Sequence, residues 1–418
     1  MTGPYPINWL DPRQSTPDLA AAAEIPPRAT PDCGDLALVL TGGGARGAYQ
    51  AGVLSFLAER FPELRIPIIT GVSAGAVNAS HLAQHRGTFA EAVRDLVALW
   101  ASLAPGSVFR VDARSLYSKS ARWALRLLLG GRGRSLWPRG LVDTEPLREF
   151  LRASMRPENG VLTGIEHNLA RGVLRAVALS TTSYTTGQNV VWVQGREIVT
   201  WERPNRRSVS AHLTVEHVMA SSALPIFFPA VRLGDAWYGD GGIRMAAPLS
   251  PALHLGAHKL LALSTRYERS EDEAARPAVV GYPPPAQVLG VLHNAIFLDV
   301  IDQDVIRLER LNRVLRKLPV EQREGMRVVE MFVVRPSRDL GRLAAQFEPR
   351  LPRTLRFLTR GLGTRETASP DVLSLLLFQD DYVGALIETG YEDARAQSDR
   401  IERFLFGDAV ARAVGAGG

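Results

Sequence analysis

The sequence predicts an α/β fold with a mostly parallel central sheet covered by helices. Two short aliphatic runs, at 36–41 and 66–70, each lead into a glycine-rich turn and then into a stretch with helical spacing. Neighbouring parallel strands need a crossover connection, so this repeated order of strand, turn and helix indicates a parallel sheet. The chain has 418 residues, 46% of them hydrophobic, which is enough for one large domain or two.

The first unit combines a buried strand with an unusually glycine-rich turn. Residues 36–41 are aliphatic and lead into Gly42-Gly43-Gly44-Ala45-Arg46-Gly47. Apolar residues at helical spacing then predict a helix over 46–60, which Pro62 ends. The turn also fits the G-x-G-x-x-G pattern of dinucleotide-binding folds. That interpretation requires an acid at the end of the second strand, and residues 70–73 contain none, so nucleotide binding is disfavoured.

The second unit carries a candidate nucleophile. A strand at 66–70 runs into Gly71-Val72-Ser73-Ala74-Gly75, and a helix follows at 74–84. This turn satisfies G-x-S-x-G, in which a serine protrudes from a sharp strand-to-helix bend between small neighbours. The helix that begins there points its free N–H groups and positive dipole end toward the serine. The pattern favours Ser73 as a nucleophile, and an ordinary tight turn is the alternative.

The glycines of the first turn are candidates for binding the negative charge that such an attack creates. Gly42, Gly43 and Gly44 can present backbone N–H groups with no side chain in the way, as an oxyanion hole requires. One such donor contributes about 3 kcal/mol to the transition state. Three interpretations of Arg46 stay open at this point: it holds the loop, it lies near a substrate phosphate, or it is a helix-surface arginine.

The rest of the chain continues the alternation of helices and strands. A hairpin turn at Gly234-Asp235 separates short strands at 229–233 and 236–238. The pattern from residue 91 to the end predicts helices at 91–103, 141–155 (Thr144 as N-cap), 208–224, 286–318, 373–378 and 382–390, and strands at 173–180, 189–193, 259–263 and 328–334.

A serine nucleophile needs a base, and Asp240 is the candidate. It lies directly after a predicted strand, in Gly239-Asp240-Gly241-Gly242. A free aspartate, with a pKa of about 3.9, is a poor base near neutrality. Burial in a water-poor cleft would raise that pKa. By itself the Asp-Gly-Gly run is equally typical of a turn.

The histidines offer no evident alternative base. The sequence predicts His212 and His217 on a helix, and His254 and His258 form an i, i+4 pair without a nearby third ligand. Such a lone pair is more often a packing or surface feature than a metal site. The single cysteine, Cys33, excludes an internal disulfide and a thiolate metal cluster. We therefore expect no metal and no cofactor.

A basic block lies between Phe109 and Arg139. It contains eight Lys or Arg residues and one acid, a net charge of +7 against +6 for the whole chain. Leucines, a tyrosine and Trp123 alternate with its basic residues, which is typical of a helix at a lipid interface. The alternative is a solvated charged face. No nucleic-acid-binding module surrounds the block, so an anionic membrane surface is the expected partner.

The bulk features bear on location. Residues 1–34 contain seven prolines and are expected to be a disordered extension. That stretch lacks the basic and apolar regions of a signal peptide. No apolar run approaches the ~18 residues of a spanning helix. The expected location is the cytoplasm, with peripheral contact to a membrane.

Taken together, these segments resemble the patatin-like phospholipase family. The resemblance rests on four segments in this order: residues 42–47, 71–75, 220–229 and 240–242. It implies a three-layer α/β/α sandwich with a Ser–Asp dyad and no histidine, in which Ser73 is the nucleophile, Asp240 the base, and Gly42, Gly43 and Gly44 the oxyanion hole. Arg46, Gly47, Gly71, Gly75, Gly241 and Gly242 support these motifs. Thr41 departs from the pattern, since an acid often precedes the glycine run.

The resemblance implies a calcium-independent hydrolase of lipid acyl esters, of the phospholipase A, lysophospholipase or esterase type. It covers residues 35–265 as a catalytic domain, with the basic insertion at about 105–140 outside the minimal fold. An acyltransferase that uses the same dyad, or a non-catalytic membrane-binding protein, are the alternatives. Residues 266–418 are expected to form a mainly helical region packed on the catalytic domain. Three interpretations of the apolar stripe at 286–318 stay open: it belongs to the core, it forms a lid over an acyl channel, or it is the contact face of a homo-oligomer.

Overall fold

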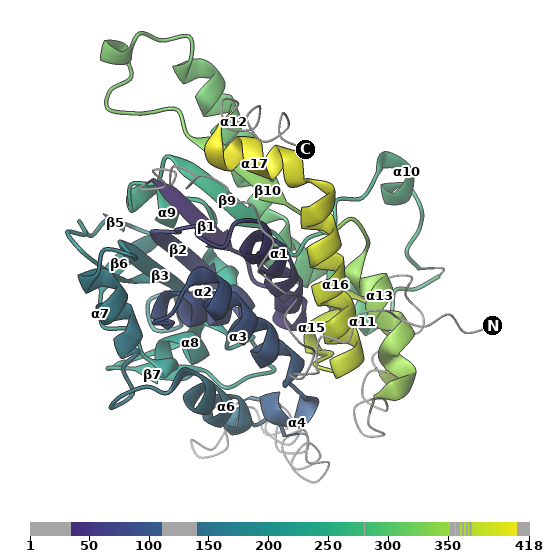
Figure 1. The fold of residues 1–418 in the computed structure, drawn as a ribbon. Helices are drawn as coiled ribbons and strands as arrows, with labels where there is room; N and C mark the ends of the chain where they lie inside the picture. Colours follow the sequence, from purple (N-terminus) through teal and green to yellow (C-terminus); the bar gives the residue numbers. More distant parts are fainter. Residues whose placement is uncertain are drawn as a thin grey trace, which may run out of the picture. The chain divides into compact units, whose positions relative to one another are not determined.

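A ten-stranded sheet organises the structure, a computed structural model shown in Figure 1. The model describes residues 35–110 and 140–407, except 280, 352–355, 357–359, 362, 365–366 and 368–369. The Pro-rich extension and most of the basic block lie outside the described residues. Five adjacent strands, in the order β10-β9-β1-β2-β3, are parallel. They span Glu330–Val334 (β10), Lys259–Leu263 (β9), Leu36–Leu40 (β1), Ile68–Val72 (β2) and Ala176–Ser183 (β3).

The sheet continues beyond β3 with mixed pairing. Strand β4 (Asn189–Gly195) is antiparallel to β3, β6 (Arg206–Ser210) is parallel to β4, and β5 (Glu202–Arg203) is antiparallel to β6. A hairpin of β7 (Val231–Leu233) and β8 (Ala236–Asp240) joins the sheet through β8, which is antiparallel to the last residues of β3. The predicted α/β class with a mostly parallel central sheet is confirmed.

Helices bury both faces of the sheet, because the side chains of its central strands alternate between two apolar cores. Leu36, Leu38 and Leu40 of β1 point to one core, and Ala37 and Val39 point to the other. The first core contains residues of α1 (Gly47–Arg60), α2 (Ala74–Gln84), α3 (Phe89–Ala101), α6 (Glu145–Met155), α7 (Thr163–Ala170), α8 (Val215–Ser221) and α16 (Asp380–Ala396). The second contains residues of α9 (Ser250–His254) and α12 (Val300–Leu315). This is the three-layer arrangement.

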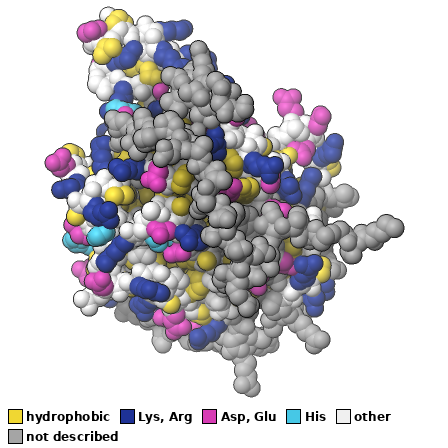
Figure 2. Space-filling model, viewed as in Figure 1, with side chains coloured by type: hydrophobic (Ala, Val, Ile, Leu, Met, Phe, Trp, Pro, Cys, Tyr) yellow, Lys and Arg dark blue, Asp and Glu magenta, His cyan; other side chains and the backbone are white. Residues whose placement is uncertain are grey.

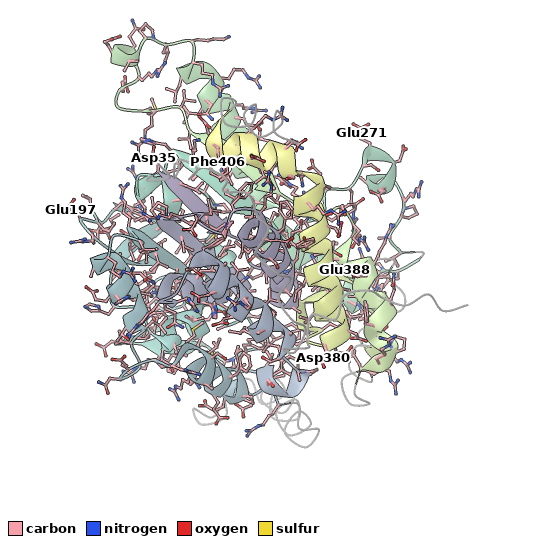
Figure 3. The ribbon with its side chains drawn as sticks, in the orientation of Figure 1. Asp35, Glu197, Glu271, Asp380, Glu388 and Phe406 are labelled. Carbon is pink, nitrogen blue, oxygen red and sulfur yellow. The ribbon has the colours of Figure 1, made fainter. Side chains whose placement is uncertain are left out.

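The C-terminal region shares the sheet and the first core. Strand β10 extends the parallel sheet beyond β9, and α16 lies alongside α1 in Figure 1. Glycines permit this close approach: a Cβ at Gly52 would lie 1.9 Å from the carbonyl oxygen of Ile387, and one at Gly390 would lie 2.0 Å from that of Tyr49. Figure 3 marks Asp380 at the start of α16 and Phe406 at the end of α17 (Ser398–Phe406).

Short elements complete the described chain. On the face seen in Figure 2, acidic and basic side chains are interspersed over the described surface. In the described part of the chain, no helix is both long and apolar enough to cross a lipid bilayer. The remaining elements are α4 (Pro105–Val108), α10 (Glu271–Ala274), α11 (Pro285–His293), α13 (Leu340–Phe347), α15 (Asp371–Leu376), the 3-10 turns η2 (Gly44–Arg46), η3 (Gly241–Arg244), η5 (Val320–Gln322) and η6 (Glu348–Arg350), and the π-helix η4 (Asn294–Leu298).

Two predicted helices are wrong in part. Residues 208–210 belong to β6, because the backbone there pairs with β4, and α8 begins only at Val215. His212 therefore lies outside a helix. The single helix predicted over 286–318 is interrupted by η4 and ends at Leu315. Its apolar stripe is core in part: Leu298 and, in α12, Ile301, Val305, Leu308 and Leu315 are buried, whereas Val288, Val291 and Leu292 of α11 are exposed.

Candidate active site

Ser73 lies on a strained bend between β2 and α2. Its φ of 55° and ψ of −127° are unfavourable for a residue with a side chain. The glycines on either side make the bend sterically feasible. A Cβ at Gly71 would lie 2.3 Å from the carbonyl oxygen of Gly75, and a Cβ at Gly75 would lie 2.2 Å from that of Leu40. The geometry is that of a nucleophile elbow.

Two serines of the α8 end hold this bend. The backbone N–H of Ser73 donates to Oγ of Ser221 at 3.0 Å, and that hydroxyl donates to the carbonyl oxygen of Ser180 on β3 at 2.7 Å. The hydroxyl of Ser222 donates to the carbonyl oxygen of Ser73 at 3.1 Å. Both serines lie in the Ala220–Pro229 stretch that carries the family resemblance, but the sequence pattern does not predict their role. Two small polar residues in succession at the end of a helix are the feature that could have indicated it.

The register of β3 brings Asp240 to Ser73. Val72, the last residue of β2, is paired with Ser180, and Asp240, the last residue of β8, is paired with Thr181. Strand β8 therefore lies on the same side of β3 as β2, and the last residue of β8 meets the last residue of β2. The hydroxyl of Thr182 donates to the carbonyl oxygen of Asp240 at 2.8 Å, which fixes the end of β8. Residues 167 positions apart in the chain thus meet at one point of the sheet.

The carboxyl group of Asp240 is fully buried, and its surroundings give it an unusual acidity. Oδ1 accepts a hydrogen bond from the N–H of Gly242 at 2.9 Å, whereas Oδ2 has no hydrogen-bond partner among the described residues. Burial raises the pKa of Asp240 to about 7, against the lowering effects of the Ser73 side chain and the Gly242 N–H. The group is therefore a base suited to neutral pH.

The glycine-rich turn packs against the elbow. A Cβ at Gly42 would lie 2.9 Å from Cβ of Ser73, and the carbonyl oxygen of Gly42 accepts a 2.6 Å hydrogen bond from the hydroxyl of Thr265. Gly43 and Gly44 adopt positive φ angles of 147° and 56°. Among the described residues, the N–H groups of these two glycines have no acceptor. They are therefore free to donate to a ligand.

Arg46 holds this turn to the C-terminal region. It is 3% exposed, and its Nη2 lies 2.5 Å from Oδ1 of Asp371 at the start of α15, while its Nε donates to Oγ of Ser374 at 2.7 Å. The surface-arginine interpretation is wrong, because the side chain is enclosed. The loop-holding interpretation is the one that these contacts support.

Replacing Arg46 by methionine is expected to destabilise the protein by about 2–3 kcal/mol, because it removes the charged partner of the partly buried carboxylate of Asp371 and leaves it only the hydrogen bond from Asn294. The double variant Arg46→Met with Asp371→Asn should recover part of that loss. Urea unfolding followed by circular dichroism measures both. A loss below 1 kcal/mol in the single variant would show that the pair does not hold the turn.

An apolar pocket opens beside Ser73. The space between its walls, including the open mouth, is about 650 Å³. Gly44 and Ser73 lie on its wall together with Ser222 and His293. The other lining residues are apolar and come from α2, α3, α4, α6, α15 and the loops after α3, α8 and α15: Ala74, Val77, Leu99, Trp100, Leu103, Val108, Leu147, Phe150, Leu151, Leu224, Phe228, Leu375, Leu376 and Phe378.

The histidines singled out in the sequence lie away from this pocket. Nδ1 of His258 lies 2.7 Å from the carboxylate of Asp35, and His254 stacks on Trp201 with ring centroids 4.5 Å apart. Within the described residues, no group of three His, Cys, Asp or Glu side chains is arranged to hold a metal ion. His293, on the pocket wall, was missed because it lies within the apolar stripe of the predicted long helix.

The structure is thus an α/β protein with a buried serine on a sharp strand-to-helix bend and a carboxyl group at the adjacent strand end. A comparison with family models matches patatin-like phospholipase over residues 38–253, slightly more than half of the chain. The chain belongs to the patatin-like phospholipase family, which confirms the resemblance seen in the motifs. No curated protein sequence matches it significantly.

Solved structures with similar architecture are distant in sequence. VipD from Legionella pneumophila is 14% identical, with 88% of this chain and 67% of that chain covered and a TM-score of 0.36. Human GIVD cytosolic phospholipase A2 in complex with methyl gamma-linolenyl fluorophosphonate is 12% identical, with 88% and 58% covered and a TM-score of 0.42. The SpcU–ExoU complex from Pseudomonas aeruginosa is 15% identical, with 88% of this chain and 60% of that chain covered and a TM-score of 0.28. The chain thus spans about two thirds or less of each of them.

Proposed function

We propose that the protein is a serine hydrolase of lipid acyl esters, with Ser73 as nucleophile and Asp240 as base. The observation that carries this proposal is the strand register, which sets Val72 and Asp240 opposite consecutive residues of β3. Ser73 follows Val72 directly, so Ser73 and Asp240 lie at neighbouring strand ends. Family membership supports the choice of a lipid ester as substrate.

The reaction follows from this geometry. Oγ of Ser73 attacks the ester carbonyl carbon while Asp240 takes the hydroxyl proton. The negative charge on the carbonyl oxygen is stabilised by the N–H groups of the glycine turn, Gly43 and Gly44 first among them. Breakdown of this intermediate releases the alcohol, which receives the proton held by Asp240, and leaves an acyl group on Ser73. Water, deprotonated by Asp240, then releases the fatty acid.

The apolar pocket is the proposed site of the acyl chain. Apart from Ser73, Ser222 and His293, its lining side chains have no polar group except the indole nitrogen of Trp100. That nitrogen donates to Oδ1 of Asn78 at 2.8 Å, so it is already satisfied. An aliphatic chain gains about 0.8 kcal/mol for each CH₂ group that it buries in such a pocket.

The direct test is labelling of the wild-type protein with a fluorophosphonate, together with the release of fatty acid from phospholipid, lysophospholipid and neutral ester vesicles. We expect covalent labelling and fatty-acid release without added calcium. Addition of a primary alcohol separates hydrolysis from acyl transfer, since a transferase would produce the new ester instead of free fatty acid. A folded wild type that is neither labelled nor active would refute the proposal.

Replacing Leu151 by tryptophan should shorten the acyl chains that the protein accepts. Leu151 of α6 is fully buried and lines the pocket, so added bulk there reduces the space for the chain. We expect the rate with long-chain esters to fall at least about tenfold, while butyrate esters react as in the wild type. Comparable losses for both substrates would place the acyl chain elsewhere. Leu308→Trp, on the opposite face of the sheet, controls for general overpacking.

The basic block at 109–139 remains the proposed contact with an anionic lipid surface, on the strength of its net charge of +7. Neutralising Arg122, Arg126, Arg132 and Arg134 together should weaken binding to anionic vesicles at least about tenfold, since each basic residue near the surface contributes about 1 kcal/mol. Vesicle co-sedimentation at low and high salt measures this. Binding that is unchanged and insensitive to salt would contradict the proposal.

A further inference from the structure

His293 lies on the wall of the pocket that holds Ser73 and Gly44. It is the last residue of α11, and its ring stacks on Phe297 with centroids 4.5 Å apart and planes 17° from parallel. Phe297 in turn covers the turn after Asp240, since a Cβ at Gly242 would lie 2.2 Å from the Phe297 ring. The imidazole is therefore held by Phe297 on the wall of the pocket, and Phe297 also packs against the turn that follows Asp240.

The imidazole has no hydrogen-bond partner within the part of the chain that the structure describes. Among the described residues, neither ring nitrogen of His293 accepts or donates a hydrogen bond, and Nε2 is also shielded from solvent. An unpaired polar atom in such a place is destabilising by about 1–3 kcal/mol. The ring nitrogen open to a ligand is Nδ1, because Nε2 is shielded from solvent.

The imidazole is also held in its neutral form. Burial and the nearby positive charge of Arg46 lower the pKa of His293 to about 3. It therefore carries one N–H donor and one acceptor nitrogen at neutral pH, and no charge. A neutral imidazole can form a hydrogen bond with an uncharged polar group such as an alkoxy oxygen or a hydroxyl.

Only one polar part of a bound ester is left to form a hydrogen bond with His293. The acyl chain is assigned to the apolar lining of the pocket, and the carbonyl oxygen to the amides of Gly43 and Gly44. The polar part that remains is the alcohol side of the ester, which begins at the alkoxy oxygen next to the carbonyl carbon.

We infer that His293 is a catalytic residue of the proposed reaction, whose neutral N–H donates a hydrogen bond to the alkoxy oxygen of the bound ester. The inference rests on the proposed function. As the bond from the carbonyl carbon to that oxygen breaks, the electron pair stays on oxygen. The proton for the alcohol comes from Asp240, and His293 keeps its own.

The test compares two substrates with the same acyl chain: a glycerol ester, whose leaving oxygen is strongly basic, and a nitrophenyl ester, whose leaving oxygen is not. His293→Phe keeps the stack on Phe297 and removes the hydrogen bond. We expect kcat/KM to fall about 10- to 100-fold for the glycerol ester and less than about threefold for the nitrophenyl ester. His293→Gln, which retains an N–H donor, should recover most of the glycerol-ester rate.

Equal losses for the two substrates, or no loss for either, would overturn the role of His293. His293→Leu offers a second apolar variant if the phenylalanine variant does not fold. The rate of fluorophosphonate labelling should stay close to that of the wild type in every variant, because fluoride leaves without a proton. A wild type that is neither labelled nor active would overturn the proposed function itself, so the two failures are distinguishable.

Discussion

Ser73→Ala is expected to abolish labelling by a fluorophosphonate and to lower the rate of fatty-acid release by about 10⁴-fold or more. Removal of a serine nucleophile leaves only the assistance that the oxyanion hole and substrate binding provide. Because the bonds that Ser221 and Ser222 make to residue 73 involve only its backbone N–H and carbonyl oxygen, alanine should leave the fold intact. Mass spectrometry of the labelled protein identifies the modified residue.

Ser80→Ala is the matched control for this variant. Ser80 lies on α2, the helix that follows Ser73, is fully buried, and its hydroxyl has no hydrogen-bond partner in the described part of the chain. Its removal should leave labelling and turnover unchanged. If Ser73→Ala were labelled at the wild-type rate, the nucleophile would be a different residue and the proposed reaction would be wrong.

Asp240→Asn should combine a large loss of activity with a gain in stability. An amide cannot accept the serine proton, so kcat should fall by about 10³- to 10⁴-fold. The amide is also neutral at every pH, whereas the wild-type carboxyl group is ionised at alkaline pH although it is fully buried. Activity and stability should therefore change in opposite directions.

The sign of the stability effect follows from the pKa. Asp240 titrates at about 7 in the folded protein, above its ordinary value of 3.8, so the folded state binds the proton more tightly than the unfolded state. This group therefore lowers the free energy of unfolding progressively as the pH rises from about 4 to about 7. At pH 8 we expect Asp240→Asn to be more stable than the wild type by about 1–4 kcal/mol. Near pH 4 the two should be alike.

The same pKa predicts the pH dependence of catalysis. In the wild type, kcat/KM should rise with pH along an acid limb centred near 7, as Asp240 loses its proton. Asp235→Asn is the control, because Asp235 is on the same hairpin and its side chain is fully exposed. That variant should keep the wild-type profile and stability. An acid limb near pH 4 in the wild type would contradict the assignment of Asp240 as a buried base.

Much of the fold could be predicted from the sequence because its signals are local. The strand at 36–41, the helix at 74–84 and the strand at 259–263 agree with β1, α2 and β9 to within one residue. Aliphatic runs between glycines and helical spacing report on each segment by itself. Where pairing with a distant strand decides the secondary structure of a segment, the local pattern predicts it wrongly. Residues 208–210 were predicted as helix, yet they form a strand because β4 is their neighbour.

The features of the candidate site also fall into those that local sequence predicts and those that it does not. The sequence by itself determined the bend at Ser73 and the open glycine turn, because small residues at fixed spacing are what such backbone shapes require. Only the tertiary structure decided where the remaining groups lie. The register of β3 sets Asp240 beside Ser73, the end of α8 supplies Ser221 and Ser222, and a helix from the C-terminal region brings His293 to the pocket. These positions depend on pairing and packing between segments far apart in the chain, and no local pattern encodes that geometry.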